Sequence, residues 1–97
     1  MKKIKVSKTQ MCRLLREQGY EVQPRRAERI RTPMWDTMVF YHGDKRCEAS
    51  LIPVGTPYTA AVLHVRERQI RPEYREREIR FQIGRQTLEK MGIRKEV

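Results

Sequence analysis

The first regular pattern along the chain is helical. Met11, Leu14 and Leu15 are apolar at positions i, i+3 and i+4, and Arg13 and Arg16 fall between them. Residues three and four apart share one face of a helix, so this spacing predicts an amphipathic helix with its arginines pointing to solvent.

Both ends of this helix are marked in the sequence. Ser7-Lys-Thr-Gln10 has the form of a capping box, in which two side chains satisfy the free backbone amides of the first turn. Gly19 is suited to end the helix because glycine adopts the left-handed backbone conformation at little cost. The preceding segment 1–6 alternates basic and apolar residues, which predicts either a short edge strand or a flexible basic arm.

The middle of the chain is typical of strands. Residues 35–41 are rich in aromatic and β-branched side chains, and residues 47–54 follow after the turn-like sequence of residues 42–45. These features predict a β-hairpin. A third apolar run over residues 58–65 predicts a central strand.

Residues 66–83 carry two competing signals. Ile79, Phe81 and Ile83 alternate with polar residues, which predicts a strand over the end of this stretch. Earlier in the stretch, Glu and Arg recur four residues apart, a spacing that suits ion pairs on a helix. We therefore expect a helical or irregular segment around 70–76, before the strand.

Two segments complete the prediction. Residues 24–31 are basic and poorly patterned, so they fit either a loop or a ragged strand, and residues 85–91 form a short helix that Gly92 ends. The whole order predicts a single α+β domain over residues 1–97. Its N-terminal helix would pack on a mostly antiparallel, three- or four-stranded sheet, with a short helix at the C-terminus.

Charge adds a functional argument. The chain has 22 Lys and Arg residues against 12 Asp and Glu residues, a formal net charge of +10, which favours association with polyanions. Residues 1–31 hold ten basic and three acidic residues, whereas the signs alternate over residues 66–80. Alternating signs are typical of a solvated surface that neutralises itself, so the cations without acidic neighbours are the ones free to contact phosphate.

The candidate contact surface consists of those unpaired cations, with one aromatic residue that could stack on bases. Its members are Lys2, Lys3, Lys5, Lys8, Arg13, Arg16, Arg25, Arg26, Arg29, Arg31 and Trp35. The leading hypothesis is a small, non-catalytic nucleic-acid-binding protein, with DNA and RNA both open as partners. The alternative is an interaction or inhibitor protein of a phage or mobile element. Such a protein would dock on an acidic surface, or on the nucleic-acid channel of a host enzyme.

Catalytic chemistry has less support in the sequence. His42 begins a turn close to Lys45 and Arg46, where it could act as a general acid or base, but no group is evident that would orient its ring. His64 lies inside an apolar run and is predicted to be a half-buried strand residue. We expect no catalytic residue.

Cysteine and hydropathy patterns restrict the class of protein further. Cys12 and Cys47 are the only cysteines, and their spacing from the two histidines does not match the close ligand pairs of zinc sites. We expect both thiols to be reduced, and we expect no metal or cofactor. No apolar run reaches the length of a membrane span, and the N-terminus lacks the apolar stretch of a signal peptide, so we expect a cytoplasmic protein.

One segment resembles a known family. Leu14-Leu-Arg-Glu-Gln-Gly-Tyr-Glu-Val22 resembles the first helix and turn of HicA-type toxins. These are basic domains with a fold like that of double-stranded-RNA-binding domains, and they cleave mRNA with a histidine. The resemblance implies a third hypothesis, a HicA-like toxin. The family's glycine–serine–histidine signature is replaced here by Pro24-Arg-Arg, so no catalytic residue is carried over.

Overall fold

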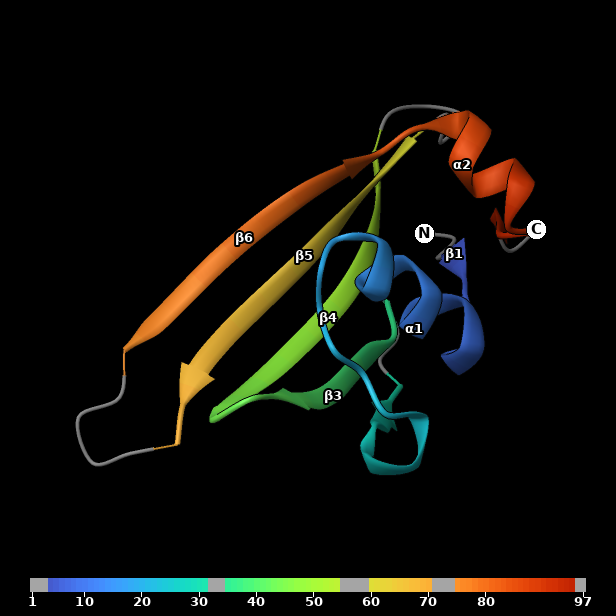
Figure 1. Cartoon of the computed structure of the whole chain (residues 1–97). Helices are drawn as coiled ribbons and strands as arrows, with labels where there is room; N and C mark the ends of the chain where they lie inside the picture. Colours follow the sequence, from blue (N-terminus) through green and yellow to red (C-terminus); the bar gives the residue numbers. More distant parts are fainter. Residues whose placement is uncertain (1–3, 32–34, 55–59, 71–74, 96–97) are drawn as a thin grey trace.

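The computed structural model describes residues 4–31, 35–54, 60–70 and 75–95 (Figure 1). Its elements are β1 (Ile4–Lys5), α1 (Lys8–Glu17), the 3-10 helix η1 (Pro24–Arg26), β2 (Glu28–Ile30), β3 (Thr37–His42), β4 (Lys45–Val54), β5 (Ala60–Gln69), β6 (Glu76–Ile83), α2 (Arg85–Lys90) and β7 (Arg94–Lys95). This order confirms the predicted α+β fold, with a helix near each end of the chain.

The main sheet is antiparallel and has five strands in the order β2-β3-β4-β5-β6. The sequence predicted three or four strands, and the additional one is β2, in the segment that fitted either a loop or a ragged strand. A separate two-stranded ladder joins β1 to β7, with Ile4 opposite Lys95. The basic N-terminal segment therefore contributes an edge strand, with residues 1–3 outside the described part.

Helix α1 forms where the apolar spacing placed it, and its predicted caps are present. The Ser7 side chain accepts a hydrogen bond from the Gln10 amide at 3.1 Å, and the Gln10 side chain accepts one from the Ser7 amide at 2.8 Å. At the other end Gly19 has a φ of 94°, and the amide of Tyr20 donates back to the Leu15 carbonyl. This arrangement is a Schellman motif, which turns the chain sharply toward the sheet.

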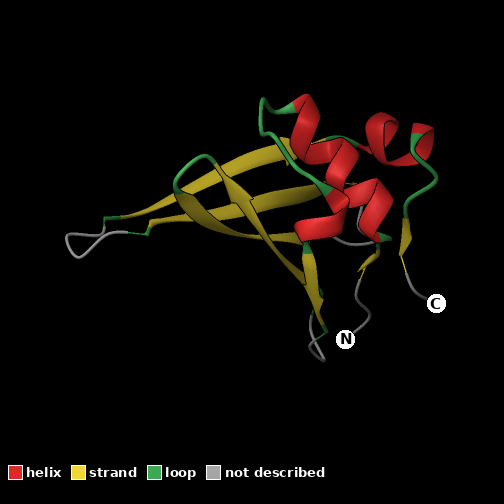
Figure 2. Cartoon of the chain, turned by 60° about the horizontal axis from the view of Figure 1, so that its bottom comes forward, coloured by secondary structure: helices red, strands yellow, loops and turns green. Residues whose placement is uncertain are grey.

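The core lies between the helices and one face of the sheet (Figure 2). Leu14 and Leu15 of α1 are fully buried, as are Phe40 of β3, Leu51 of β4 and Leu63 of β5. Successive residues of a strand point to opposite faces, so only alternate residues of each strand meet the helices. No described element covers the other face of the sheet.

Strands β5 and β6 form a long hairpin that extends away from the helices (Figure 1). The sequence predicted a helical or irregular segment around residues 70–76. This prediction is wrong at the end of the segment, because Glu76 already belongs to β6. Residues 71–74 lie outside the described residues. The strand β5 continues through Arg66 to Gln69, although these residues are polar, because the neighbouring strands supply their charge partners.

We expect the Leu14→Ala variant to lose about 2–5 kcal/mol of unfolding free energy, since Leu14 is fully buried and a cavity would remain under α1. Arg13→Ala on the solvent side of the same helix is the matched control and should change stability by less than about 0.5 kcal/mol. Urea denaturation of both variants measures the difference. Equal losses of unfolding free energy in the two variants would show that α1 does not anchor the core.

Candidate nucleic-acid interface

The solvent side of α1 and the 3-10 helix η1 carry cations that have no acidic partner in the part of the chain that the structure describes. Arg13 and Arg16 are exposed on α1, Arg25 and Arg26 are exposed on η1, and Lys8 is half-buried at the start of α1. Within the described part of the chain, no ion pair joins any of them to a carboxylate. These five residues are called the α1–η1 surface below.

Specific contacts hold the two parts of the α1–η1 surface in place. The Arg16 guanidinium donates to the Val22 carbonyl at 2.9 Å, which ties the end of α1 to the segment that leads into η1. The Arg26 guanidinium carbon lies 5.7 Å from the centre of the Tyr41 ring on β3, within the range of a cation–π interaction. These contacts leave other guanidinium nitrogens of both arginines available for a ligand.

Arg29 was predicted to be a free cation, and this prediction is wrong. One of its terminal nitrogens lies 2.7 Å from the Asp36 carboxylate and also donates to the Val6 carbonyl at 2.7 Å. Asp36 is buried, so the pair joins β2 to the start of β3 inside the fold. Arg29 therefore has a structural role and is left out of the α1–η1 surface.

The other candidates from the sequence have different environments. Lys5 on β1 and Arg31 after β2 are exposed. Trp35 is half-buried and makes an interaction within the fold, so its ring is not a free stacking surface. Lys2 and Lys3 lie outside the described residues.

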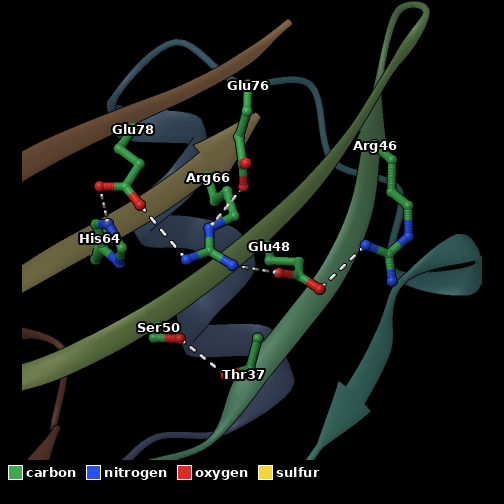
Figure 3. Close-up of polar contacts among 8 residues, drawn as sticks. All are labelled: Thr37, Arg46, Glu48, Ser50, His64, Arg66, Glu76 and Glu78. Carbon is green, nitrogen blue, oxygen red and sulfur yellow. Dashed lines mark hydrogen bonds and ion pairs between the residues drawn. The ribbon is translucent and has the colours of Figure 1, made fainter. Parts of the chain in front are cut away.

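On the uncovered face of the sheet, charged side chains pair with one another (Figure 3). Arg66 of β5 is central, with nitrogens 3.0 Å from Glu76, 3.4 Å from Glu78 and 3.9 Å from Glu48. Arg46 of β4 lies 3.0 Å from the second oxygen of Glu48. The arginines of this face are thus largely neutralised, in contrast to those of the α1–η1 surface.

The strand register explains why these pairs form. Arg66 stands directly opposite Glu78, and Arg68 stands opposite Glu76, so opposite charges face each other across β5 and β6. The spacing of four residues between Glu76 and Arg80 suggested a helical pair. In the strand, Arg80 instead lies 3.6 Å from Glu78.

A buried carboxylate lies on the helix-facing side of the same hairpin. Glu67 is only 6% exposed and accepts a 2.7 Å hydrogen bond from the Tyr20 hydroxyl. Its other oxygen lies 3.5 Å from the Lys45 ammonium and 3.9 Å from the Arg77 guanidinium. A buried carboxylate is stable only when such donors and cations compensate the loss of water.

These contacts shift the pKa values of both Glu67, the acceptor of the hydrogen bond, and Tyr20, its donor. Burial alone would raise the pKa of Glu67, but the Tyr20 hydroxyl, Lys45 and Arg77 together outweigh it and hold that pKa below its ordinary value. Burial and the neighbouring Glu67 carboxylate raise the pKa of Tyr20. The pair is therefore a neutral phenol that donates to an ionised carboxylate at neutral pH.

His42 is packed into the fold beside this cluster. Its Nδ1 atom accepts a 3.0 Å hydrogen bond from the Glu21 amide, and its ring lies edge-on to Tyr20 with the ring centres 5.3 Å apart. The remaining proton of a neutral ring is therefore on Nε2. These contacts give His42 a positioning role where the chain passes from α1 to η1.

The Glu67 cluster was missed from the sequence, although a signal for it exists. Leu63 and Val65 alternate toward the core, and Glu67 is the next residue in the same two-residue pattern. Ending the predicted strand at Val65 left Glu67 in the charged stretch that follows. Extending the alternation by two residues would have placed this carboxylate on the buried face.

No significant match to this chain was found among protein-family models, curated proteins or solved structures. Among residues 4–31, 35–54, 60–70 and 75–95, no three side chains of the metal-ligating types come together as a group. No helix in these ranges is long and apolar enough to cross a membrane.

We expect Glu67→Gln to lower the unfolding free energy at pH 7 by about 1–3 kcal/mol, since hydrogen bonds to a charged group are lost. The pKa of Glu67 is lower in the folded protein, so its stabilisation is complete above the unfolded value of about 4.3 and disappears as the pH falls. The difference from wild type should therefore shrink in acid. Glu89→Gln, on the exposed side of α2, should show neither effect. A Glu67→Gln difference that stays constant from pH 7 to pH 3 would contradict this linkage.

A second pH effect is expected in alkali. Burial and the nearby Glu67 raise the pKa of the Cys47 thiol to about 11. Its contribution to stability is complete below the unfolded value of about 9.0 and is lost as the pH rises, by roughly 2–3 kcal/mol in total. Comparing wild type with Cys47→Ala in urea, under reducing conditions, should show a difference that narrows from pH 8 to pH 11. A difference in unfolding free energy that stays constant over this pH range would exclude the Cys47 effect.

Proposed function

We propose that this chain binds nucleic acid through the α1–η1 surface, without catalysing a reaction. The observation that carries the proposal is the separation of two kinds of charge. The arginines of the uncovered sheet face are engaged by carboxylates, whereas the cations of the α1–η1 surface have no acidic partner among the described residues. Unpaired, exposed arginines are the groups that displace counterions from phosphates.

Arginine suits this role for a chemical reason. Its planar guanidinium can donate two parallel hydrogen bonds to one phosphate, and it is only weakly hydrated. Arg13, Arg16, Arg25 and Arg26 present four such groups on neighbouring elements. A short connecting segment separates the two arginines of α1 from the two arginines of η1. This arrangement would let the four side chains contact several phosphates of one strand or one duplex.

The contacts of His42 support binding over histidine-dependent cleavage. One ring nitrogen accepts the Glu21 amide and the ring packs against Tyr20, so the side chain serves the fold. A HicA-like reaction would need a histidine placed against the phosphate instead. An acidic protein surface would contact the same cations. The binding experiment below distinguishes such a partner from nucleic acid.

The test is double charge reversal. Arg25→Glu with Arg26→Glu should weaken binding to DNA or RNA oligonucleotides on the order of tenfold or more, and should lower the slope of log affinity against log salt by about 1.4–1.8. The control reverses Arg80 and Arg85, two exposed arginines that pair with Glu78 and Glu89. Fluorescence anisotropy with single- and double-stranded probes from about 50 to 200 mM salt measures both quantities.

Two results would contradict the proposal. Equal losses of oligonucleotide affinity in the two double variants would mean that net charge alone governs binding. No binding of wild type to any probe at about 50 mM salt would instead favour docking of the same cations on an acidic protein.

A further inference from the structure

A cavity of about 260 Å³ opens at the end of the sheet that lies far from α2. Its lining residues come from three adjacent strands and the segment before β6, and they are Lys45, Glu67, Gln69, Arg75, Glu76 and Arg77. Lys45 stands opposite Gln69 in the sheet register, and Glu67 stands opposite Arg77. The fold therefore gathers three cations around one opening, called the hairpin pocket below.

The charges of the hairpin pocket do not cancel. Glu76 contributes to the lining, but its carboxylate is bound to Arg66 on the uncovered face at 3.0 Å. Among the described residues of the lining, Glu67 is then the one remaining carboxylate, against Lys45, Arg75 and Arg77. A net positive pocket of this size suits an anion with several oxygens.

Glu67 also fixes the geometry of two of these cations. Its carboxylate is held by the Tyr20 hydroxyl at 2.7 Å, and it lies 3.5 Å from Lys45 and 3.9 Å from Arg77. Lys45 and Arg77 are 33% and 69% exposed, so their other donors remain open to the cavity. Arg75 has no carboxylate partner within the described residues. A site whose donors are already oriented loses less entropy when a ligand binds.

A buried hydrogen bond links the hairpin pocket to the segment that follows α1. Tyr20, which holds Glu67, follows α1 directly after Gly19. Arg26 of η1 lies over Tyr41, which points to the opposite face of the sheet from Lys45.

We propose that the hairpin pocket binds one phosphate group of the nucleic acid. The proposal rests on the proposed function for its ligand, while its chemistry rests on Lys45, Arg75 and Arg77. Arginine donates paired hydrogen bonds to phosphate oxygens and lysine acts as a point charge, a combination that recognises a phosphate group without regard to the attached base.

The experiment neutralises Arg75, the lining cation that pairs with no carboxylate of the described residues. Arg75→Gln removes the positive charge but keeps a polar side chain, and it should lower the salt slope of oligonucleotide binding by about 0.7–0.9, the value of one phosphate contact. Arg80→Gln removes an exposed arginine from the uncovered face and should leave the slope unchanged. An unchanged slope for Arg75→Gln, with a lowered slope for the Arg25 and Arg26 double variant, would overturn the pocket and leave the proposed function intact.

A second arm uses inorganic phosphate at constant ionic strength. Wild type should show saturable shifts of the Glu67 and Gln69 amide resonances on titration, and Arg75→Gln should not. If wild type binds no oligonucleotide, the proposed function fails. If the amide resonances of wild type still shifted on titration with inorganic phosphate, the pocket would be a site for free phosphate and not for nucleic acid. The absence of both responses would overturn the pocket altogether.

Discussion

The packing of α1 against one face of the sheet decides the environment of nearly every charged residue in this protein. Leu14 and Leu15 are fully buried in that contact, and they fix which side of β4 and β5 faces the core. Because side chains alternate along a strand, a shift of one residue would bring Arg66 under the helix and expose Leu63. The apolar contact thus sets the positions of groups that take no part in it.

Charge is accommodated in three different ways around this core. On the uncovered face, Arg66 and its carboxylates pair in contact with water, where each ion pair contributes little. Inside the fold, Glu67 needs Tyr20 and the nearby cations, since a buried charge without partners would cost several kcal/mol. The cations of the α1–η1 surface have no acidic partner among the described residues, which costs self-repulsion and leaves them available to a polyanion.

Tyr20 connects these regions. Its ring lies edge-on to Phe40, His42 and Phe81, and its hydroxyl holds Glu67. The residue stands immediately after the glycine that ends α1, so the direction of the chain at that turn carries the ring into the sheet. The same contact places the end of the basic helix beside the hairpin pocket.

The sequence by itself determined the elements that depend on near neighbours. The capping box at Ser7, the end of α1 at Gly19 and the hairpin turn at Gly43 are local signals, and each lies where the pattern predicted it. The surplus of positive charge in the first third of the chain is likewise a property of composition alone. These features need no knowledge of the register between strands.

Only the tertiary structure decided which charges pair. Arg29 looked free because residues 24–31 hold four arginines and a single glutamate, yet Asp36 reaches it across the β2–β3 connection. Arg66 finds its main partners on β6, and Glu67 finds Tyr20, 47 residues away in the chain. Neighbours in a strand point to opposite faces, so residues adjacent in sequence are seldom partners. The pairing depends on strand register, which is set by the burial of the apolar face as a whole.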